Sequence, residues 1–381
     1  MKAIVVGSGS FGSWSALKLQ LAGHQVTLVD AWGPGNSRSS SGGQTRVIRT
    51  VYGEDEFYVE MAHRSMRQWD ELQQKVGKSL MELTGSLWLC GEDDSYLTAA
   101  LPGMESLGLR LEEYSIRQAC EKWPQVNFTG LARAVLEPTS GFLRARQACQ
   151  AVAEQLETVG GKRIQARVTQ PDISQPVTGI QLHSGETLNA DVIVFACGPW
   201  MGELFPGLLQ ETIQVSRQEV YYFGVPSGRK RFEKGHLPIW LELNQPIYYG
   251  LPSIDQRGFK LARDERGPSF DPTTDERICT PELVQQAREY LAIRFPEMAD
   301  APLVESRVCQ YSNTLDGHFI IDRHQPSGLV MVGGGSGHGF KMGPAVGEAV
   351  LDIVKNENTI SSFGLERFAG IDRKSTQFDH S

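Results

Sequence analysis

Apolar residues at the start of the chain predict a strand, a helix and a second strand. Residues 1–6 (MKAIVV) have the pattern of a short buried strand, and residues 25–30 (QVTLVD) have the pattern of another that ends on Asp30. The stretch between them, SWSALKLQLAG, has helical periodicity. One face of the expected helix carries Trp14, Leu17 and Leu21.

Further along the chain, helical and alternating patterns succeed one another without one regular repeat. Helical spacing predicts helices over 55–76, 143–158 and 280–295, the last with Thr280 as N-cap and Pro281 in its first turn. Short strands are predicted at 85–90, 108–114 and 303–311. The alternating stretches between 215 and 263 are joined by Pro, Gly and Asn turns, as in an antiparallel sheet: VYYFGV, PIWLEL, PIYYGLPS and FKLAR.

The turn after the first strand, GSGSFG, contains Gly7, Gly9 and Gly12. The first glycine permits a tight turn, the second lets the backbone approach a pyrophosphate, and the third lets the helix pack close to the strand. Asp30 follows 18 residues after Gly12, where a carboxylate hydrogen-bonds a ribose hydroxyl. The pattern predicts a dinucleotide site and does not separate NAD from FAD.

Similar features recur in the middle and at the end of the chain. LNADVIVFACGPW (188–200) is a buried strand ending in a glycine turn, and 329–354 is a strand, a glycine-rich turn and a helix. The fold class predicted is mixed α/β: a Rossmann-like dinucleotide domain interleaved with an antiparallel-sheet substrate domain. Residues 1–80, 145–214 and 301–381 are assigned to the first domain, and 81–144 and 215–300 to the second.

Composition and charge narrow the class of protein. The 381 residues carry a formal charge of −8, which gives no net basic field to attract a nucleic acid. The six cysteines form no CxxC pair and no zinc-ligand spacing with a histidine, so no metal site is expected. Scattered cysteines, a short N-terminal apolar run and the lack of an 18-residue apolar run predict a cytoplasmic protein outside the membrane.

Several longer stretches make the chain resemble a known family. The sequence is similar, nearly end to end, to flavin-dependent amine oxidases of the monomeric sarcosine oxidase and N-methyltryptophan oxidase type, within the D-amino acid oxidase-like group. The resemblance is carried by GSGSFG, GGQTRVIR, ACGPW, YYGLPS, GFKLAR, RVCQYSNTLDGHFIID and SGHGFKMGP. It implies FAD as cofactor, a monomer, and oxidation of a small amine by O2.

The resemblance also implies roles for a cysteine and a lysine. Cys309, in RVCQY, would hold the flavin covalently as a thioether, whereas a cysteine in a strand is otherwise a small hydrophobe. Lys260, in GFKLAR, would lie beside the flavin and stabilise the superoxide that forms when oxygen takes an electron. The alternative for Lys260 is a strand lysine that points to solvent.

Other matching residues are implied to bind substrate or flavin. Arg49 and Lys341 would hold the substrate carboxylate, with a surface ion pair and a solvated loop lysine as the alternatives. Arg46 would lie close to the flavin ring. Tyr249 and Tyr311 would line the substrate pocket or pack in the core. In SGHG the residues on the flavin side would be Gly337, His338 and Gly339, although the histidine could instead pack against the backbone.

One position departs from the family pattern. Sarcosine-type members have a histidine four residues after the lysine, and this chain has Asp264 there. A negative charge would disfavour a bare small carboxylate and could attract a second amino group. The expected function is oxidation of a secondary amine or N-substituted amino acid to an imine with release of hydrogen peroxide. The alternatives are a dehydrogenase of the same fold with another electron acceptor, and a flavin-binding regulatory protein.

Overall fold

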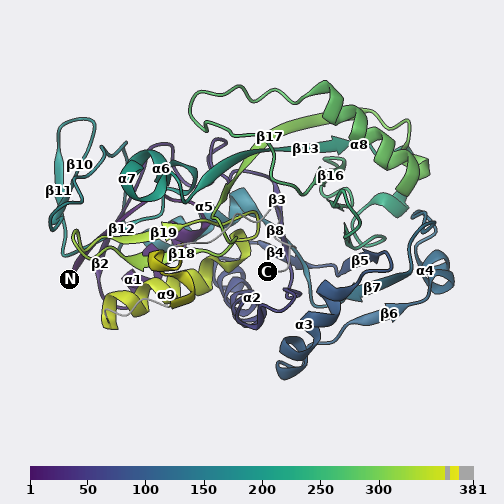
Figure 1. Ribbon diagram of the computed structural model, residues 1–381, viewed down its shortest axis with the longest axis horizontal. Helices are drawn as coiled ribbons and strands as arrows, with labels where there is room; N and C mark the ends of the chain where they lie inside the picture. Colours follow the sequence, from purple (N-terminus) through teal and green to yellow (C-terminus); the bar gives the residue numbers. More distant parts are fainter. Residues whose placement is uncertain (357–360, 369–381) are drawn as a thin grey trace.

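The computed structural model describes residues 1–356 and 361–368. Within these residues, two large sheets lie side by side along the length of the molecule (Figure 1). The N-terminal strand and the C-terminal helix belong to the same half, so the chain leaves that half and returns to it.

The first sheet has six strands and contains the start of the chain. All neighbours in it are parallel except the edge strand β18, which is antiparallel to β19. Parallel strands of this kind are buried on both faces, and the central ones are almost wholly apolar. Its order is β18 (Ile320–Arg323), β19 (Val330–Gly333), β12 (Val192–Phe195), β1 (Lys2–Val6), β2 (Gln25–Asp30) and β9 (Lys162–Gln165).

Two helices that are distant in sequence pack together beside this sheet. Helix α1 (Ser10–Leu21) lies against α9 (Gly343–Asn356), and both are seen below the sheet in Figure 1. A Cβ at Gly347 would come within 2.8 Å of the Trp14 carbonyl oxygen, so the glycine allows the two helices to approach closely. The first and last helices are thereby joined in one core.

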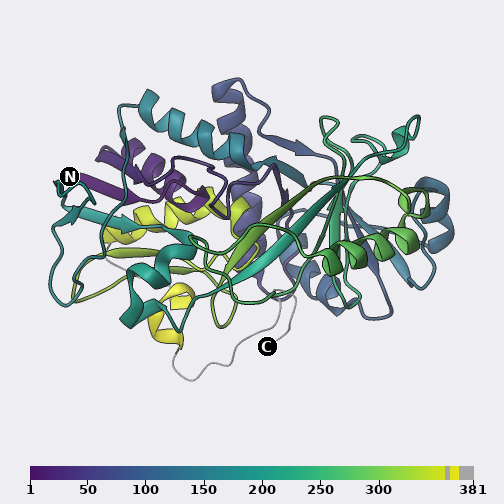
Figure 2. The ribbon, with the colours of Figure 1, turned by 90° about the horizontal axis from the view of Figure 1, so that it is seen from above.

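The second sheet has eight strands and is mainly antiparallel, with one parallel pair between β14 and β5. Helix α8 (Pro281–Arg294) packs along it, as the view from above shows (Figure 2). Its order is β17 (Leu303–Asn313), β13 (Gln214–Phe223), β16 (Phe259–Arg263), β15 (Tyr248–Leu251), β14 (Ile239–Glu242), β5 (Ser86–Cys90), β7 (Arg133–Glu137) and β6 (Glu112–Tyr114).

Smaller elements connect the two sheets. A three-stranded sheet is made by β3 (Thr45–Ile48), β8 (Gly141–Arg144) and β4 (Met81–Leu83), and β10 (Gly179–Gln181) pairs with β11 (Thr187–Asn189). The remaining α-helices are α2 (Glu56–Val76), α3 (Ser95–Ser106), α4 (Ile116–Lys122), α5 (Ala145–Thr158), α6 (Met201–Leu204) and α7 (Pro206–Leu209).

The mixed α/β fold class is confirmed, and some predicted elements need correction. Leu21, expected on the buried face of α1, is 56% exposed, because it occupies the last helical position before the turn at Gly23. The strand expected over 108–114 is shorter, since Gly108 has a φ of +70° just after α3 and the strand begins only at Glu112. The domain boundaries stay a prediction, and their residues 357–360 and 369–381 lie outside the described part.

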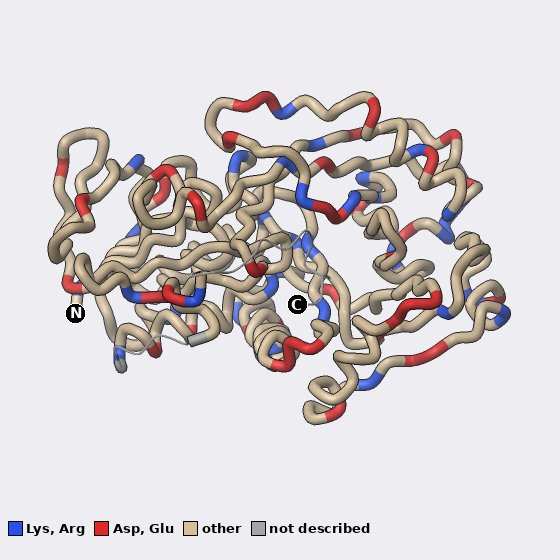
Figure 3. Tube along the Cα trace, in the orientation of Figure 1, with Lys and Arg blue, Asp and Glu red and all other residues tan. Residues whose placement is uncertain are grey.

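Charged residues of both signs are interspersed over both halves (Figure 3). Among the described residues, none of the helices is both long and apolar enough to span a bilayer. All six cysteines are free thiols.

Candidate active site

The glycine turn between β1 and α1 is as tight as its sequence suggests. Gly7 has a φ of +103°, and a Cβ there would lie 2.4 Å from the Ala196 carbonyl oxygen. At Gly12 a Cβ would fall 1.8 Å from the Gly7 carbonyl oxygen. Any side chain at either position would force the turn open, so these glycines are required by close backbone contact. Gly9 is the N-cap of α1, and the Ser10 N–H in the first turn donates to the Ser41 Oγ at 3.2 Å.

Asp30, at the end of β2, closes the same turn. One carboxylate oxygen accepts a hydrogen bond from the Ser8 backbone N–H at 2.7 Å. The other accepts from the N–H groups of Trp32 and Gly33, at 2.8 and 2.7 Å. The carboxylate therefore fixes the loop geometry, and it also lines the adjoining cavity.

Three adjoining cavities run from Asp30 to Lys260. The first, of about 230 Å³, contains Gly7 and Asp30, and it shares Gly9 and Ser40 with the second, of about 120 Å³. The third, of about 60 Å³, is lined by Lys260. The second and third cavities share Arg46, Cys309, Tyr311 and Gly337. An extended ligand with a phosphate near Gly9 fits this path better than a compact one.

Cys309 lies on β17 at the junction of the second and third cavities, with its side chain partly exposed. The Arg46 Nη2 donates to the cysteine Sγ at 3.5 Å. Arg46 is itself fixed by hydrogen bonds to the carbonyl oxygens of Thr45 and Ser40. The cysteine therefore faces the open space and is not packed as a core hydrophobe.

Lys260 lies in the interior, on the central strand β16, and its side chain does not point to solvent. It is 3% exposed, and its Nζ donates to the carbonyl oxygen and to the Oγ1 of Thr45, both at 3.2 Å. Burial, with the nearby Arg46 charge, lowers its pKa to about 7. Its charge is therefore poised to change near neutral pH.

Arg49 and Lys341 converge on Tyr52. The Arg49 guanidinium lies 4.4 Å from the Tyr52 ring centroid and donates to the Val51 carbonyl oxygen. The Lys341 Nζ donates to the Tyr52 hydroxyl at 2.6 Å and to the His338 carbonyl oxygen at 2.8 Å. Both side chains are nearly fully buried, so neither is the solvated cation of the alternative interpretation. Burial and the Arg49 charge hold the pKa of Lys341 well below its usual value.

Sequence reasoning missed two members of this group, Tyr52 and Glu137. Glu137 is fully buried, and it accepts from Thr50 Oγ1 at 2.7 Å and from Trp88 Nε1 at 3.4 Å. Burial raises its pKa, while its bonds to Thr50 and the charge of Arg49 oppose the rise. Tyr52 was detectable by its closeness to Arg49 in sequence. No local pattern marked Glu137, which β7 brings from far along the chain.

Asp264 follows directly after β16 and faces inward, with 7% of its surface exposed. Its carboxylate accepts a hydrogen bond from the Tyr311 hydroxyl at 3.1 Å. Burial and the Asp264 charge both raise the pKa values of Tyr311 and Tyr249. These two tyrosines line the cavity of Lys260, so they belong to the site and are not only core packing.

His338 lies in the glycine loop before α9, stacked on the Phe319 ring at 4.8 Å between centroids. Its Nε2 contacts the Gly317 carbonyl oxygen at 3.0 Å, and among the described residues its buried Nδ1 has no hydrogen-bond partner. Burial, followed by the Lys341 charge, holds the pKa of His338 well below its usual value, so the ring is neutral at pH 7. Neighbouring Gly337 and Gly339 lie against Tyr311 and Phe11, with no room for a Cβ.

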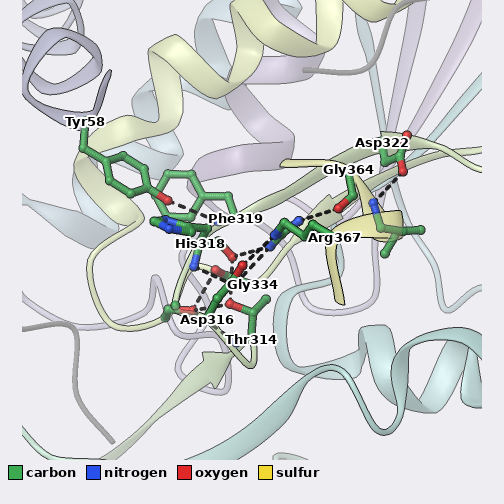
Figure 4. Close-up of polar contacts among 12 residues, drawn as sticks. Tyr58, Thr314, Asp316, His318, Phe319, Asp322, Gly334, Gly364 and Arg367 are labelled. Atoms are coloured by element: carbon green, nitrogen blue, oxygen red, sulfur yellow. Dashed lines mark hydrogen bonds and ion pairs between the residues drawn. The ribbon is translucent and has the colours of Figure 1, made fainter. Parts of the chain in front are cut away.

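A polar network holds the connection between β17 and β18, which carries the Gly317 carbonyl oxygen that His338 contacts (Figure 4). Arg367, near the C-terminus, pairs with Asp316 at 2.7 Å and donates to the His318 carbonyl oxygen at 3.0 Å. Thr314 Oγ1 donates to the same carbonyl oxygen at 2.7 Å. The connection between β17 and β18 is thus held from two sides.

The structure therefore gathers the predicted residues into three groups. The first holds the glycine turn and Asp30, the second holds Cys309, Arg46 and Lys260, and the third surrounds Tyr52. Tyr311 connects the last two groups through Asp264, whose charge acts on Lys341 as well. The three cavities described above are lined by neither Arg49 nor Lys341.

Comparisons with known proteins identify the family of this chain. Residues 2–353 match the family model described as DAO, FAD dependent oxidoreductase. A monomeric sarcosine oxidase of Bacillus sp. (strain B-0618) is 32% identical over 373 residues, covering 96% of this chain and 95% of that protein. N-methyl-L-tryptophan oxidase of Yersinia pestis (strain Pestoides F) is 28% identical, covering 96% and 98%. The resemblance inferred from sequence is thereby confirmed.

Solved structures share the fold at lower identity. L-proline dehydrogenase from P. horikoshii has a TM-score of 0.83 at 21% identity, covering 97% of each chain. Fructosamine oxidase (Amadoriase II) from Aspergillus fumigatus has a TM-score of 0.79 at 21% identity, covering 98% of this chain and 91% of that one.

Proposed function

This chain belongs to the FAD dependent oxidoreductase family, and from that premise we propose that it is an amine oxidase. Its substrate is a secondary amine or N-substituted amino acid that carries a carboxylate. The products are an imine, which water hydrolyses, and hydrogen peroxide. The amine loses two electrons and two protons, and O2 gains both, so the reaction balances.

The cofactor would lie along the three adjoining cavities. Bound FAD supplies the redox chemistry, taking a hydride equivalent from the amine and passing electrons to oxygen. The backbone N–H groups at the start of α1 would face its pyrophosphate, and Asp30 would accept from a ribose hydroxyl. Cys309 opens onto the junction of two cavities, where its Sγ would hold the flavin through a thioether.

The observation that carries the proposal is the convergence of Arg49 and Lys341 on Tyr52. A buried cation is costly unless a negative group accompanies it. The two groups that accept hydrogen bonds from Lys341 in this structure, a hydroxyl and a carbonyl, are both neutral, and they use two of its three N–H donors. A substrate carboxylate would complete this group through charge-assisted hydrogen bonds.

Lys260 would serve the second half of the reaction. Its Nζ lies in the cavity that also contains Cys309 and Arg46. A preorganised cation there stabilises negative charge as it develops on oxygen, without waiting for solvent to reorient. This role distinguishes an oxidase from a dehydrogenase of the same fold. A monomer, implied by the family resemblance, and a reducing cytoplasm, predicted from the scattered cysteines, remain part of the proposal.

A panel of matched amines tests the proposal. Peroxide release is measured for N-methyl amino acids and for the same amines with a methyl group in place of the carboxylate. We expect one peroxide per amine oxidised, and a loss of at least tenfold in kcat/KM without the carboxylate. Arg49→Ala and Lys341→Ala should remove that preference, each costing about 1.5–3 kcal/mol of transition-state binding.

Other outcomes of the panel would contradict specific parts of the proposal. Turnover with a dye acceptor but no peroxide would indicate the dehydrogenase. Equal kcat/KM for an N-methyl amino acid and its analogue without the carboxylate would show that the enzyme does not recognise the carboxylate.

A further inference from the structure

We propose that Asp264 binds the reacting nitrogen of the substrate as an ammonium ion, so that the enzyme selects zwitterionic amines. The inference rests on the proposed function and specifies the form in which its substrate binds. It assigns Asp264 to substrate selection, with Arg49 and Lys341 taking the opposite charge. A carboxylate and a cation on one small molecule would then each meet a buried group of opposite sign.

The position of Asp264 favours the reacting nitrogen over a remote second amino group. Tyr311, which donates to its carboxylate at 3.1 Å, also lines both cavities that contain Cys309. The carboxylate is therefore one side chain away from the space assigned to the flavin. A group that must lie close to the flavin is the nitrogen next to the oxidised carbon.

The backbone holds this carboxylate in place. The Asp264 N–H donates to the Ile247 carbonyl oxygen at 2.9 Å, which continues the pairing of β16 with β15. A carboxylate offers about four acceptor sites on its two oxygens. One oxygen accepts from Tyr311, and a substrate ammonium would give the same carboxylate a charge-assisted bond.

The charges around Asp264 agree with this assignment. Tyr311 on β17 donates to Asp264, and the pKa values of Tyr311 and of Tyr249 on β15 are raised by burial and then by the Asp264 charge. The Asp264 charge also opposes the lowering of the Lys341 pKa. The adjacent Arg263 pairs with Glu265 at 2.6 Å and also lines the cavity of Lys260. The Asp264 charge therefore acts on the two tyrosines and on Lys341.

This arrangement has a defined effect on pH dependence. A negative charge beside the bound ammonium raises the pKa of that amine, and the amine must lose its proton before a hydride can leave. With Asp264 present, the rise of kcat with pH should therefore have its midpoint at a higher pH than with a neutral side chain at this position. Asp264→Asn keeps an acceptor for Tyr311 and removes the charge, so that rise should shift to lower pH.

The experiment compares two ligands in the flavin-loaded enzyme. One is an N-methyl amino acid, and the other is the same carboxylate with a thioether in place of the amine. Their dissociation constants are measured anaerobically from the change in flavin absorbance, and kcat is measured from pH 6 to 11, a range that includes the pKa of about 10.4 of an ordinary alkyl ammonium. Tyr311→Phe is the matched control, because it removes the hydrogen bond and leaves the charge.

We expect Asp264→Asn to weaken the amine at least tenfold and leave the thioether unchanged or tighter, with the rise in kcat moved about one pH unit down. Equal weakening of both ligands, with an unmoved profile, would mean that Asp264 only positions Tyr311 and would overturn the proposal. If the variant fails to fold, the wild type decides: amine binding should weaken above the amine's own pKa while thioether binding stays constant. A wild type that binds the amine but oxidises none contradicts the proposed function, and the two ligands still test Asp264.

Discussion

Burial of Lys260 makes the charge of this residue sensitive to pH. Its pKa is about 7, so the cation is present below that pH and is lost above it. If the cation stabilises superoxide, kcat/KM for oxygen should fall as pH rises, with a midpoint at 7 or higher, because a bound anion would raise the pKa. Stopped-flow reoxidation of the reduced enzyme measures this dependence.

Lys260→Met should lower kcat/KM for oxygen about 100-fold and remove its pH dependence. Reduction of the flavin by amine without oxygen should be nearly unchanged. Lys234→Met, at an exposed position paired with Glu82, is the matched control. If reoxidation is equally fast in Lys260→Met, the lysine has no role with oxygen and the dehydrogenase becomes the better account.

Cys309 gives a test of how the flavin is held. After acid precipitation, the yellow colour should stay with the wild-type pellet and move to the supernatant in Cys309→Ser. Cys279→Ser is the control, since that partly buried cysteine lines none of the three cavities. Colour in the supernatant of the wild type would show that Cys309 only lines the cavity.

At the residue scale, motifs predicted more than composition did. Lys260, Arg49 and Lys341 were identified by stretches that resemble the family, and all three are buried, whereas lysine is usually exposed. Tyr52 and Glu137 could not be identified in this way, because neither was assigned a role by the resemblance. Their importance arises from what they contact across the fold, and single-residue patterns carry no such information.

At the element scale, segments with a clear period were predicted well, short strands such as β2 and β5 included, and segments without one were not. The helix expected over 55–76 spans Glu56–Val76, because its apolar positions keep one period for six turns. Helix α3 went unpredicted: Pro102 lies inside it, and its sequence, SYLTAALPGMES, has no sustained polar face. Pairing partners such as β3 with β8 depend on distant contacts that the sequence pattern does not encode.

The C-terminal segment should contribute measurable stability through Arg367. Its ion pair with Asp316 is about nine-tenths buried on both sides. Removing one partner leaves a buried charge, so Arg367→Ala should lower the free energy of unfolding by about 3 kcal/mol. Urea unfolding measures the loss. Arg163→Ala, which breaks an exposed pair with Glu157, should cost less than about 1 kcal/mol.

The ion pair between Arg367 and Asp316 also predicts how the free energy of unfolding depends on pH. Burial opposes ionisation of Asp316, but Arg367 holds the pKa of this carboxyl below its usual value. The contribution of the ionised carboxyl to the free energy of unfolding is therefore complete above the pKa of the unfolded state, about 3.9. It is lost as pH falls through the lower pKa of the folded state. If the free energy of unfolding falls with pH as much in Asp316→Asn as in the wild type, this ion pair is excluded as the cause.

At the scale of the whole molecule, the site depends on segments from across the chain. β3 brings Arg46, β16 brings Lys260 and β17 brings Cys309, while Lys341 comes from the turn before the last helix. The interleaved order of nucleotide-type and antiparallel segments was visible in the sequence. The meeting of Asp264 with Tyr311, which connects the two groups of cations, required the folded structure.

Anaerobic absorbance of the bound flavin tests the central claim most directly. The yellow enzyme is mixed with an N-methyl amino acid in the absence of oxygen, and oxygen is then admitted. The account predicts that the visible flavin absorbance bleaches, then returns on admission of oxygen with one peroxide formed per flavin. Flavin that stays yellow with every amine of the panel would contradict the assignment of an amine oxidase.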